Sequence, residues 1–193
     1  EVSVAHARYF AATAEMIGAD LKTPREAGAV VRGDASFADL RVAQRFAWQI
    51  GDFDLAFGLI GSVGEYAMRT LRYEIFSWAD RVSIEAQRSD HSVIPLITGI
   101  SAFGAWVRGE YDKALALADA AQLAEVDPDG VPSGIVERVR ANVLYSTGRM
   151  SEALAQVMRL IELADDSGED SRLVHALYMG SVGYSSIGDF DRA

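Results

Sequence analysis

The sequence predicts an all-α protein, a right-handed solenoid of antiparallel helix pairs preceded by irregular capping helices. One pattern carries this prediction: a glycine, then an aromatic residue or methionine two positions later, then an alanine five positions after the glycine. It begins at Gly109, Gly148 and Gly188, with spacings of 39 and 40 residues. An earlier copy begins at Gly51 and a degenerate one at Leu71. Internal periods in this range are typical of stacked helical arrays.

Composition limits the classes of function. The chain has 193 residues, half of them hydrophobic, and no cysteine, which removes disulfides, thiolate metal sites and a cysteine nucleophile. No basic and apolar leader opens the sequence and no long apolar run interrupts it, so we expect a cytoplasmic protein without a membrane segment. The net charge is −10, and only four arginines accompany eleven acidic residues between Asp119 and Asp170, which argues against direct nucleic-acid binding.

The first fifty residues predict capping and junction helices. Apolar side chains recur at gaps of three and four over residues 3–21, which predicts a first helix. The sequence Thr23-Pro24-Arg25-Glu26 predicts the start of a second helix. Thr23 would cap this helix, Pro24 would occupy its first position, and Glu26 is placed to reach back toward the cap. We expect a short second helix that ends at Gly33.

Residues 51–193 predict the repeat array. Turn signals recur about every twenty residues, and we expect helix junctions near residues 51, 71, 90, 109, 129, 148, 168 and 188. The turns are short, so successive helices run antiparallel. The one stretch of strand-like composition contains Pro95 and is predicted to be helical. Because the last copy of the pattern stops at Ala193, we expect the array to be truncated there and to continue in a longer chain.

Small residues define the register within each helix pair. Ala114 and Ala153 lie on the second helix of a pair, where they face the first helix. Ala102 and Ala141 occupy the matching position on the first helix, seven residues before each glycine. Small side chains on both sides allow the two helices to approach closely.

This register resembles the tetratricopeptide repeat (TPR). The resemblance covers about residues 52–193 and fits best over residues 105–114 and 144–148. The proline that ends a repeat in the family is displaced to Pro128 in one unit and absent elsewhere, and Leu71 replaces the glycine of the first unit. The resemblance implies a TPR-like solenoid whose first helices line a concave binding face.

A second resemblance begins at the N-terminus. Residues 6–10 (His-Ala-Arg-Tyr-Phe), 39–43 (Asp-Leu-Arg-Val-Ala) and 47–52 (Ala-Trp-Gln-Ile-Gly-Asp) resemble the junction between the ATPase and the repeat array of large bacterial regulators. Those proteins are signal-transduction ATPases of the maltose-regulator type, often with a LuxR-like DNA-binding domain or an adenylate cyclase domain. The sequence has no phosphate-binding loop of its own, so the resemblance implies a regulatory array beside such domains.

Three features that suggest ligand chemistry have simpler explanations. Gly58, Gly61 and Gly64 lack the spacing of a dinucleotide loop and the lysine of a phosphate loop, and are predicted to let a neighbouring helix approach. Residues 125–130 resemble the opening of a calcium loop but lack its bidentate glutamate. The acidic run over residues 165–170 is typical of a helix start.

The sequence contains no recognisable catalytic or metal-binding motif. His6, His91 and His175 have no second histidine or carboxylate at ligand spacing, and no nucleophile elbow is present. We therefore predict no metal, no cofactor and no catalysis within this segment.

The candidate site is the concave face of the array. Arg138 and Asn142, four residues apart, are placed to hold a carboxylate, and aromatic side chains beside them are typical of peptide recognition. The alternative is that Phe103 and Trp106 are core residues and Arg138 is a solvated charge. The residues predicted to line the groove are Phe103, Trp106, Arg138, Asn142, Tyr145, His175, Tyr178 and Val182.

The sequence thus predicts a non-catalytic module that binds a protein, a peptide or a small inducer in this groove. Binding would regulate neighbouring domains of a larger bacterial transcriptional regulator or cyclase-linked ATPase. The alternatives are a stand-alone TPR adaptor, a self-association scaffold such as a homodimer, and an enzyme domain built on helical hairpins.

Overall fold

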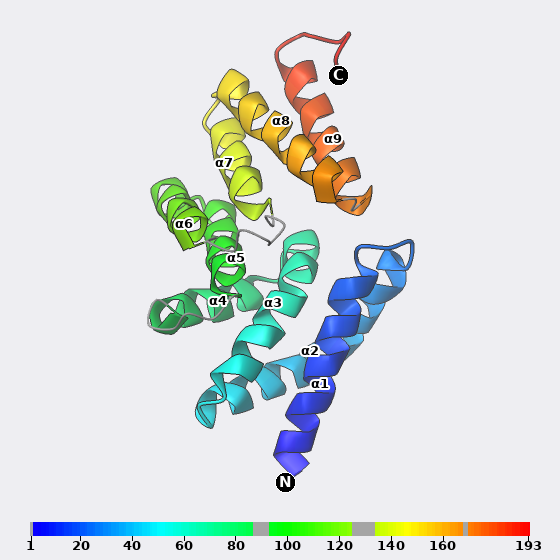
Figure 1. Ribbon diagram of the computed structural model, residues 1–193, viewed down its shortest axis with the longest axis vertical. Coiled ribbons are helices and arrows are strands. Elements are labelled where there is room, and N and C mark those ends of the chain that lie inside the picture. Colours follow the sequence, from blue (N-terminus) through cyan, green and yellow to red (C-terminus); the bar gives the residue numbers. More distant parts are fainter. Residues whose placement is uncertain (1, 87–92, 125–133, 168–169) are drawn as a thin grey trace. The chain divides into compact units, whose positions relative to one another are not determined.

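The computed structural model describes residues 2–86, 93–124, 134–167 and 170–193, and over these residues every regular element is an α-helix (Figure 1). The all-α prediction is therefore confirmed for the described part of the chain. The helices are α1 (Val2–Asp20), α2 (Glu26–Gln49), α3 (Phe53–Thr70), α4 (Tyr73–Ala86), α5 (Ile94–Val107), α6 (Tyr111–Ala124), α7 (Ile135–Ser146), α8 (Met150–Ser167) and α9 (Asp170–Ser186).

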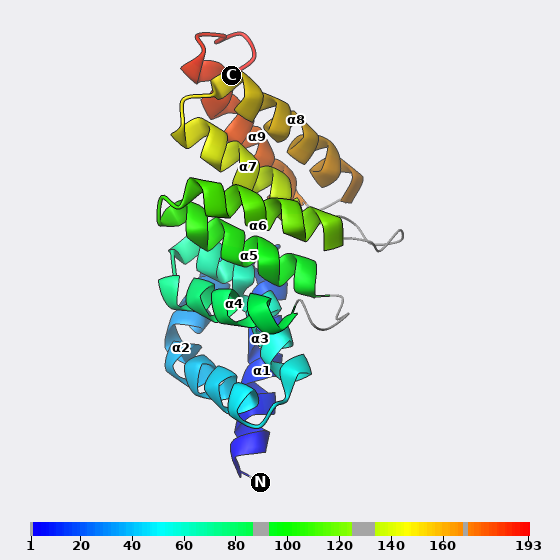
Figure 2. The ribbon, with the colours of Figure 1, turned by 90° about the vertical axis from the view of Figure 1, so that its left-hand side faces the viewer.

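The helices divide into two compact units, Glu1–Ile100 and Ser101–Ala193. In the first unit α2 packs against both α1 and α3, so the boundary expected near residue 50 falls inside this unit. In the second unit α8 packs against α7 and α9, and Figures 1 and 2 both show these three helices side by side. None of the helices in the described residues is long and apolar enough to cross a bilayer.

The repeated pattern marks a helix end with a left-handed residue. At each copy, the N–H of the following residue donates to the carbonyl five positions earlier, as Glu110 does to Ala105 (2.9 Å) and Arg149 to Leu144 (2.9 Å). This is the hydrogen bond of a Schellman cap, which glycine permits because it has no Cβ. At the five copies of the pattern, the left-handed residues are Gly51 (φ 72°), Leu71 (φ 53°), Gly109 (φ 78°), Gly148 (φ 76°) and Gly188 (φ 80°).

Leu71 shows that the degenerate copy of the pattern makes the same turn. It adopts the left-handed conformation, and the next residue, Arg72, donates to Ala67 across 3.1 Å. Left-handed backbone costs a residue with a Cβ roughly 1–2 kcal/mol. The turn geometry is thus kept at this position without the residue that favours it.

The prediction that a short second helix ends at Gly33 is wrong, because α2 runs without a break from Glu26 to Gln49. Gly33 is buried inside this helix, and a Cβ built on it would lie 2.5 Å from Cε2 of Tyr66 on α3. The glycine therefore serves close packing of α2 against α3 and does not terminate the helix.

Tyr66 belongs to a polar network beside this contact. Its hydroxyl donates to Asp34 (2.6 Å) and accepts from Nε of Arg72 (3.1 Å), and Arg72 also pairs with Asp34. Burial, followed by the hydrogen bond to Asp34, raises the pKa of Tyr66 to about 12. The hydrogen bonds from Tyr66 and Arg72 lower the pKa of Asp34.

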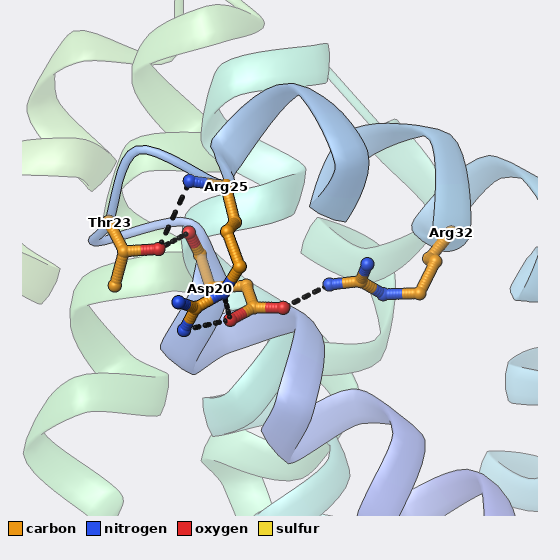
Figure 3. A network of polar contacts seen from close by, with 4 residues as sticks. All are labelled: Asp20, Thr23, Arg25 and Arg32. Carbon is orange, nitrogen blue, oxygen red and sulfur yellow. Dashed lines mark hydrogen bonds and ion pairs between the residues drawn. The ribbon is translucent and has the colours of Figure 1, made fainter.

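A second polar network closes the turn between α1 and α2 (Figure 3). Asp20, at the end of α1, accepts from Nε of Arg25 (2.7 Å) and also pairs with Arg32 of α2. The hydroxyl of Thr23 donates to the carbonyl of Asp20 (2.9 Å) and accepts from the N–H of Arg25 (3.2 Å). The hydrogen bond from Arg25 is the main reason that the pKa of Asp20 is lowered.

The expected reciprocal cap at this turn does not form. The residue before α2 is Arg25, and no side chain caps the helix start there. Glu26 pairs instead with Arg69 of α3, which also binds Glu65 on its own helix. The carboxylate of Glu26 therefore links α2 to α3.

Two of the three spaced glycines on α3 serve close packing, as predicted. A Cβ on Gly61 would lie 2.8 Å from Val93, and one on Gly64 would lie 2.3 Å from Ile100. A Cβ on Gly58 would meet nothing within 4 Å. The packing explanation is confirmed for Gly61 and Gly64 and does not apply to Gly58.

The cores of the two units differ in composition. The alanines expected between paired helices, Ala102, Ala114, Ala141 and Ala153, are all fully buried in the second unit. The cluster that joins α7, α8 and α9 combines two alanines with a valine, a leucine and a methionine. The largest fully buried side chains of the described residues, such as Tyr66, Phe76 and Leu40, belong to the first unit. The members of the α7–α9 cluster are Ala141, Val157, Leu160, Ala176 and Met179, with Tyr145 and Ile161 packed against it.

Candidate functional site

The eight predicted groove residues lie on α5, α7 and α9, all within the second unit. We refer to these three helices, from Ser101 onward, as the first-helix row. Successive members of the row touch one another through predicted groove residues. The side chains differ in exposure, however, and this separates those that hold the row together from those that a partner can reach.

Phe103, Trp106 and Arg138 form one cluster between α5 and α7. Phe103 is only 3% exposed and meets Trp106 edge to face, with ring centroids 5.0 Å apart. The guanidinium carbon of Arg138 lies 5.2 Å from the centre of the Phe103 ring. The indole N–H of Trp106 donates to the hydroxyl of Ser146 across 3.0 Å. These contacts attach α5 to α7, and they leave Trp106 and Arg138 half-buried.

Tyr145 connects α7 to α9. Its hydroxyl donates to the backbone carbonyl of Met179 (3.0 Å), and burial raises the pKa of Tyr145. A Cβ on Gly183 would lie 2.3 Å from that hydroxyl oxygen, so the helices approach closely at this point. Asn142 and His175 lie on the same helices and are half-buried.

The exposed part of the row is on α9. Tyr178 is 66% exposed and Val182 is 42% exposed, as a partner-binding role requires. Val174 (66%) and Leu177 (51%) lie on the same side of the helix, and sequence reasoning did not single them out. Val174 and Val182 are each four residues from Tyr178, and Leu177 is three residues from Val174, so the helical spacing is the signal that relates the four side chains. Together they form an exposed apolar surface on α9.

No group of three or more histidine and acidic side chains suited to a metal occurs among the described residues. The imidazole of His6 lies 3.0 Å from the carboxylate of Asp39. The calcium-loop-like stretch over residues 125–130, His91, and residues 168 and 169 of the acidic run lie outside the described part. The acidic run is not simply a helix start as predicted, because Asp165 and Asp166 lie in the last turn of α8 and only Asp170 opens α9.

The first unit contains a pocket that the sequence analysis did not predict. Its volume is about 250 Å³, and it lies between one face of α2 and one face of α4. The available signal was positional, because the lining residues recur at intervals of three and four on each helix. They are Arg41, Gln44, Arg45 and Trp48 of α2, and Glu74, Trp78, Arg81 and Val82 of α4.

Comparison of the chain with protein-family models, with curated proteins and with solved structures found no match.

Proposed function

We propose that this chain is a TPR-like helical repeat module that binds a protein or peptide on its first-helix row and performs no catalysis. The observation that carries the proposal is the succession of contacts along that row. Arg138 of α7 stacks over Phe103 of α5, and Tyr145 of α7 donates to the backbone of α9. Stacked repeats build a continuous binding surface when the first helices of successive pairs touch in this way.

The exposed face of α9 supports a partner of apolar or mixed character. Val174, Leu177, Tyr178 and Val182 are each at least 42% exposed, although their side chains are apolar or amphipathic. Contiguous apolar surface of this kind is typical of protein interaction sites. Tyrosine is also enriched among residues whose loss weakens an interface most.

A regulatory role in a larger bacterial protein is part of the proposal. It is supported by the resemblance of the N-terminal stretches to the junction before a regulator's repeat array. Two of those stretches meet, because His6 of α1 contacts Asp39 of α2. A partner or inducer that binds one conformation better would shift the state of neighbouring ATPase, cyclase or DNA-binding domains.

Peptide selection from a displayed random library tests the proposal. Peptides enriched on the chain should bind a Tyr178→Ala variant at least about tenfold more weakly, because truncating an interface tyrosine commonly costs more than 1 kcal/mol. The matched control is Tyr9→Ala, since Tyr9 of α1 is 67% exposed and Tyr178 is 66% exposed. Equal binding of the enriched peptides to both variants would refute the proposed surface.

Two further measurements separate the alternatives. Sedimentation of the chain should show a monomer, whereas a dimer that Tyr178→Ala dissociates would favour a self-association scaffold. Incubation with ATP should give no hydrolysis, and turnover above background would contradict the non-catalytic assignment.

A further inference from the structure

The pocket of the first unit has the chemistry of an anion site. We propose that it binds a small planar organic anion, an aromatic ring that carries one carboxylate or phosphate group. All of its lining residues lie within Glu1–Ile100, so the proposal is independent of the partner surface on the second unit. Its volume of about 250 Å³ is just below the range of about 300–1,000 Å³ typical of drug-sized ligands, which favours a ligand of one or two rings.

Three arginines line the pocket, and only one of them is neutralised by the pocket's own acid. Arg41 binds Glu74 through two hydrogen bonds of 2.7 and 2.8 Å, so this pair is nearly neutral. Arg45 and Arg81 are exposed and have no ion pair among the described residues. The pocket therefore carries about two uncompensated positive charges in a chain whose net charge is −10. A guanidinium suits a carboxylate or phosphate because it offers two parallel N–H donors.

The walls of the pocket are aromatic and already fixed. Trp78 is 3% exposed, and its ring is stacked on Phe37 with centroids 6.0 Å apart. Trp48 is 37% exposed and meets Phe53 edge to face, with centroids 5.5 Å apart. Side chains held in this way lose little entropy when a ring packs against them. Indole surfaces beside arginines favour a planar ring over an aliphatic one.

Gln44 is a buried polar residue among those that line the pocket. It is 5% exposed, and its carboxamide oxygen has no hydrogen-bond partner among the described residues. A buried acceptor without a donor is costly, so a ligand that provides an N–H or O–H is favoured at this point. The preferred anion thus carries a hydrogen-bond donor in addition to its charged group.

Tryptophan fluorescence gives a direct binding assay. Two of the three tryptophans line the pocket, so a Trp106→Phe background confines the signal to Trp48 and Trp78. In 0.15 M salt, 4-hydroxybenzoate and phenyl phosphate should each change the fluorescence saturably. Two control probes should each bind at least about tenfold more weakly. The first is 4-hydroxybenzamide, which has no charged group, and the second is inorganic phosphate, which has no aromatic ring.

Substitutions then locate the site. Arg45→Ala and Arg81→Ala should each weaken binding of both aromatic anions at least about tenfold. Arg45→Gln repeats the test with a smaller change in volume. Arg8→Ala removes one exposed arginine of α1 outside the pocket and should leave the affinity unchanged. Gln44→Met should abolish any preference for 4-hydroxybenzoate over benzoate.

Three results would overturn the proposal. The first is a lack of saturable binding of either aromatic anion to the chain. The second is an equal loss of affinity in Arg8→Ala and in the pocket variants, which would indicate a general charge effect. The third is binding of inorganic phosphate as tight as that of phenyl phosphate, which would exclude a role for the aromatic walls.

Discussion

Replacing Gly33 by alanine should destabilise the protein, although alanine is normally the better helix former. Gly33 lies within α2, where exchange of glycine for alanine is ordinarily worth about 1 kcal/mol in favour of the helix. Here the new Cβ would lie 2.5 Å from the ring of Tyr66, whereas ordinary contact begins at 3.4 Å. The ring must therefore move by roughly 0.9 Å, the difference between these two distances.

That movement is costly because Tyr66 is fully buried and its hydroxyl is held by Asp34 at 2.6 Å. Overpacking of a core costs about 1–3 kcal/mol, and a weakened hydrogen bond adds about 0.5–1.5 kcal/mol. After subtraction of the gain in helix propensity, we expect Gly33→Ala to lower the free energy of unfolding by about 1–3 kcal/mol.

Gly58→Ala is the matched control. Gly58 also lies inside a helix, and a Cβ there meets nothing within 4 Å. Its substitution should raise the free energy of unfolding by about 0.5–1 kcal/mol. Urea denaturation followed by circular dichroism measures both variants. If Gly33→Ala has the same free energy of unfolding as Gly58→Ala, α2 does not pack against Tyr66 as closely as described.

Further predictions concern the turns and the buried tyrosine. Gly148→Ala should lower the free energy of unfolding by about 1–2 kcal/mol, because φ is 76° at this position. Leu71→Gly should raise it by up to about 1 kcal/mol, because φ is 53° there. A stabilised Gly148→Ala or a destabilised Leu71→Gly in thermal denaturation would contradict the turn geometry. The pKa of Tyr66 is raised to about 12 from an unfolded value near 10, so its contribution to stability is complete below pH 10 and is lost as pH rises toward 12. Tyr66→Phe should therefore lose less stability than the parent chain between pH 10 and 12; equal losses in urea titrations would show that Tyr66 does not titrate as described. The lowered pKa of Asp34 has the opposite sign, so its contribution is present above its unfolded pKa of about 3.9 and is lost at lower pH. An Asp34→Asn variant should accordingly show a weaker loss of stability than the parent below pH 4 in the same titrations.

The features predictable from the sequence are those that depend on local backbone chemistry. A helix that ends in a left-handed turn needs a residue that tolerates positive φ, so the glycines at positions 109 and 148 are enough to predict these turns. Leu71 was recognisable only because it keeps the period of the repeat. The burial of Ala114 and Ala153 follows from the same register.

The features that escaped prediction depend on partners distant in the sequence. Gly33 has the same local signal as a terminating glycine, and only the position of Tyr66, 33 residues later, explains its place inside a helix. The pocket likewise needs α2 and α4 to be brought together before Arg45 and Arg81 share a site. Exposure along α9 could not be read from the sequence, because apolar spacing alone does not distinguish a buried face from an exposed one.

Hydrogen–deuterium exchange of the chain with a peptide selected on it tests the proposed partner surface most directly. The account predicts slower exchange in α9, where the first-helix row presents Tyr178 and Val182, and unchanged exchange in α1. Protection confined to α1 and α2, or none at a peptide concentration that saturates the chain, would contradict the claim that the second unit is the binding surface.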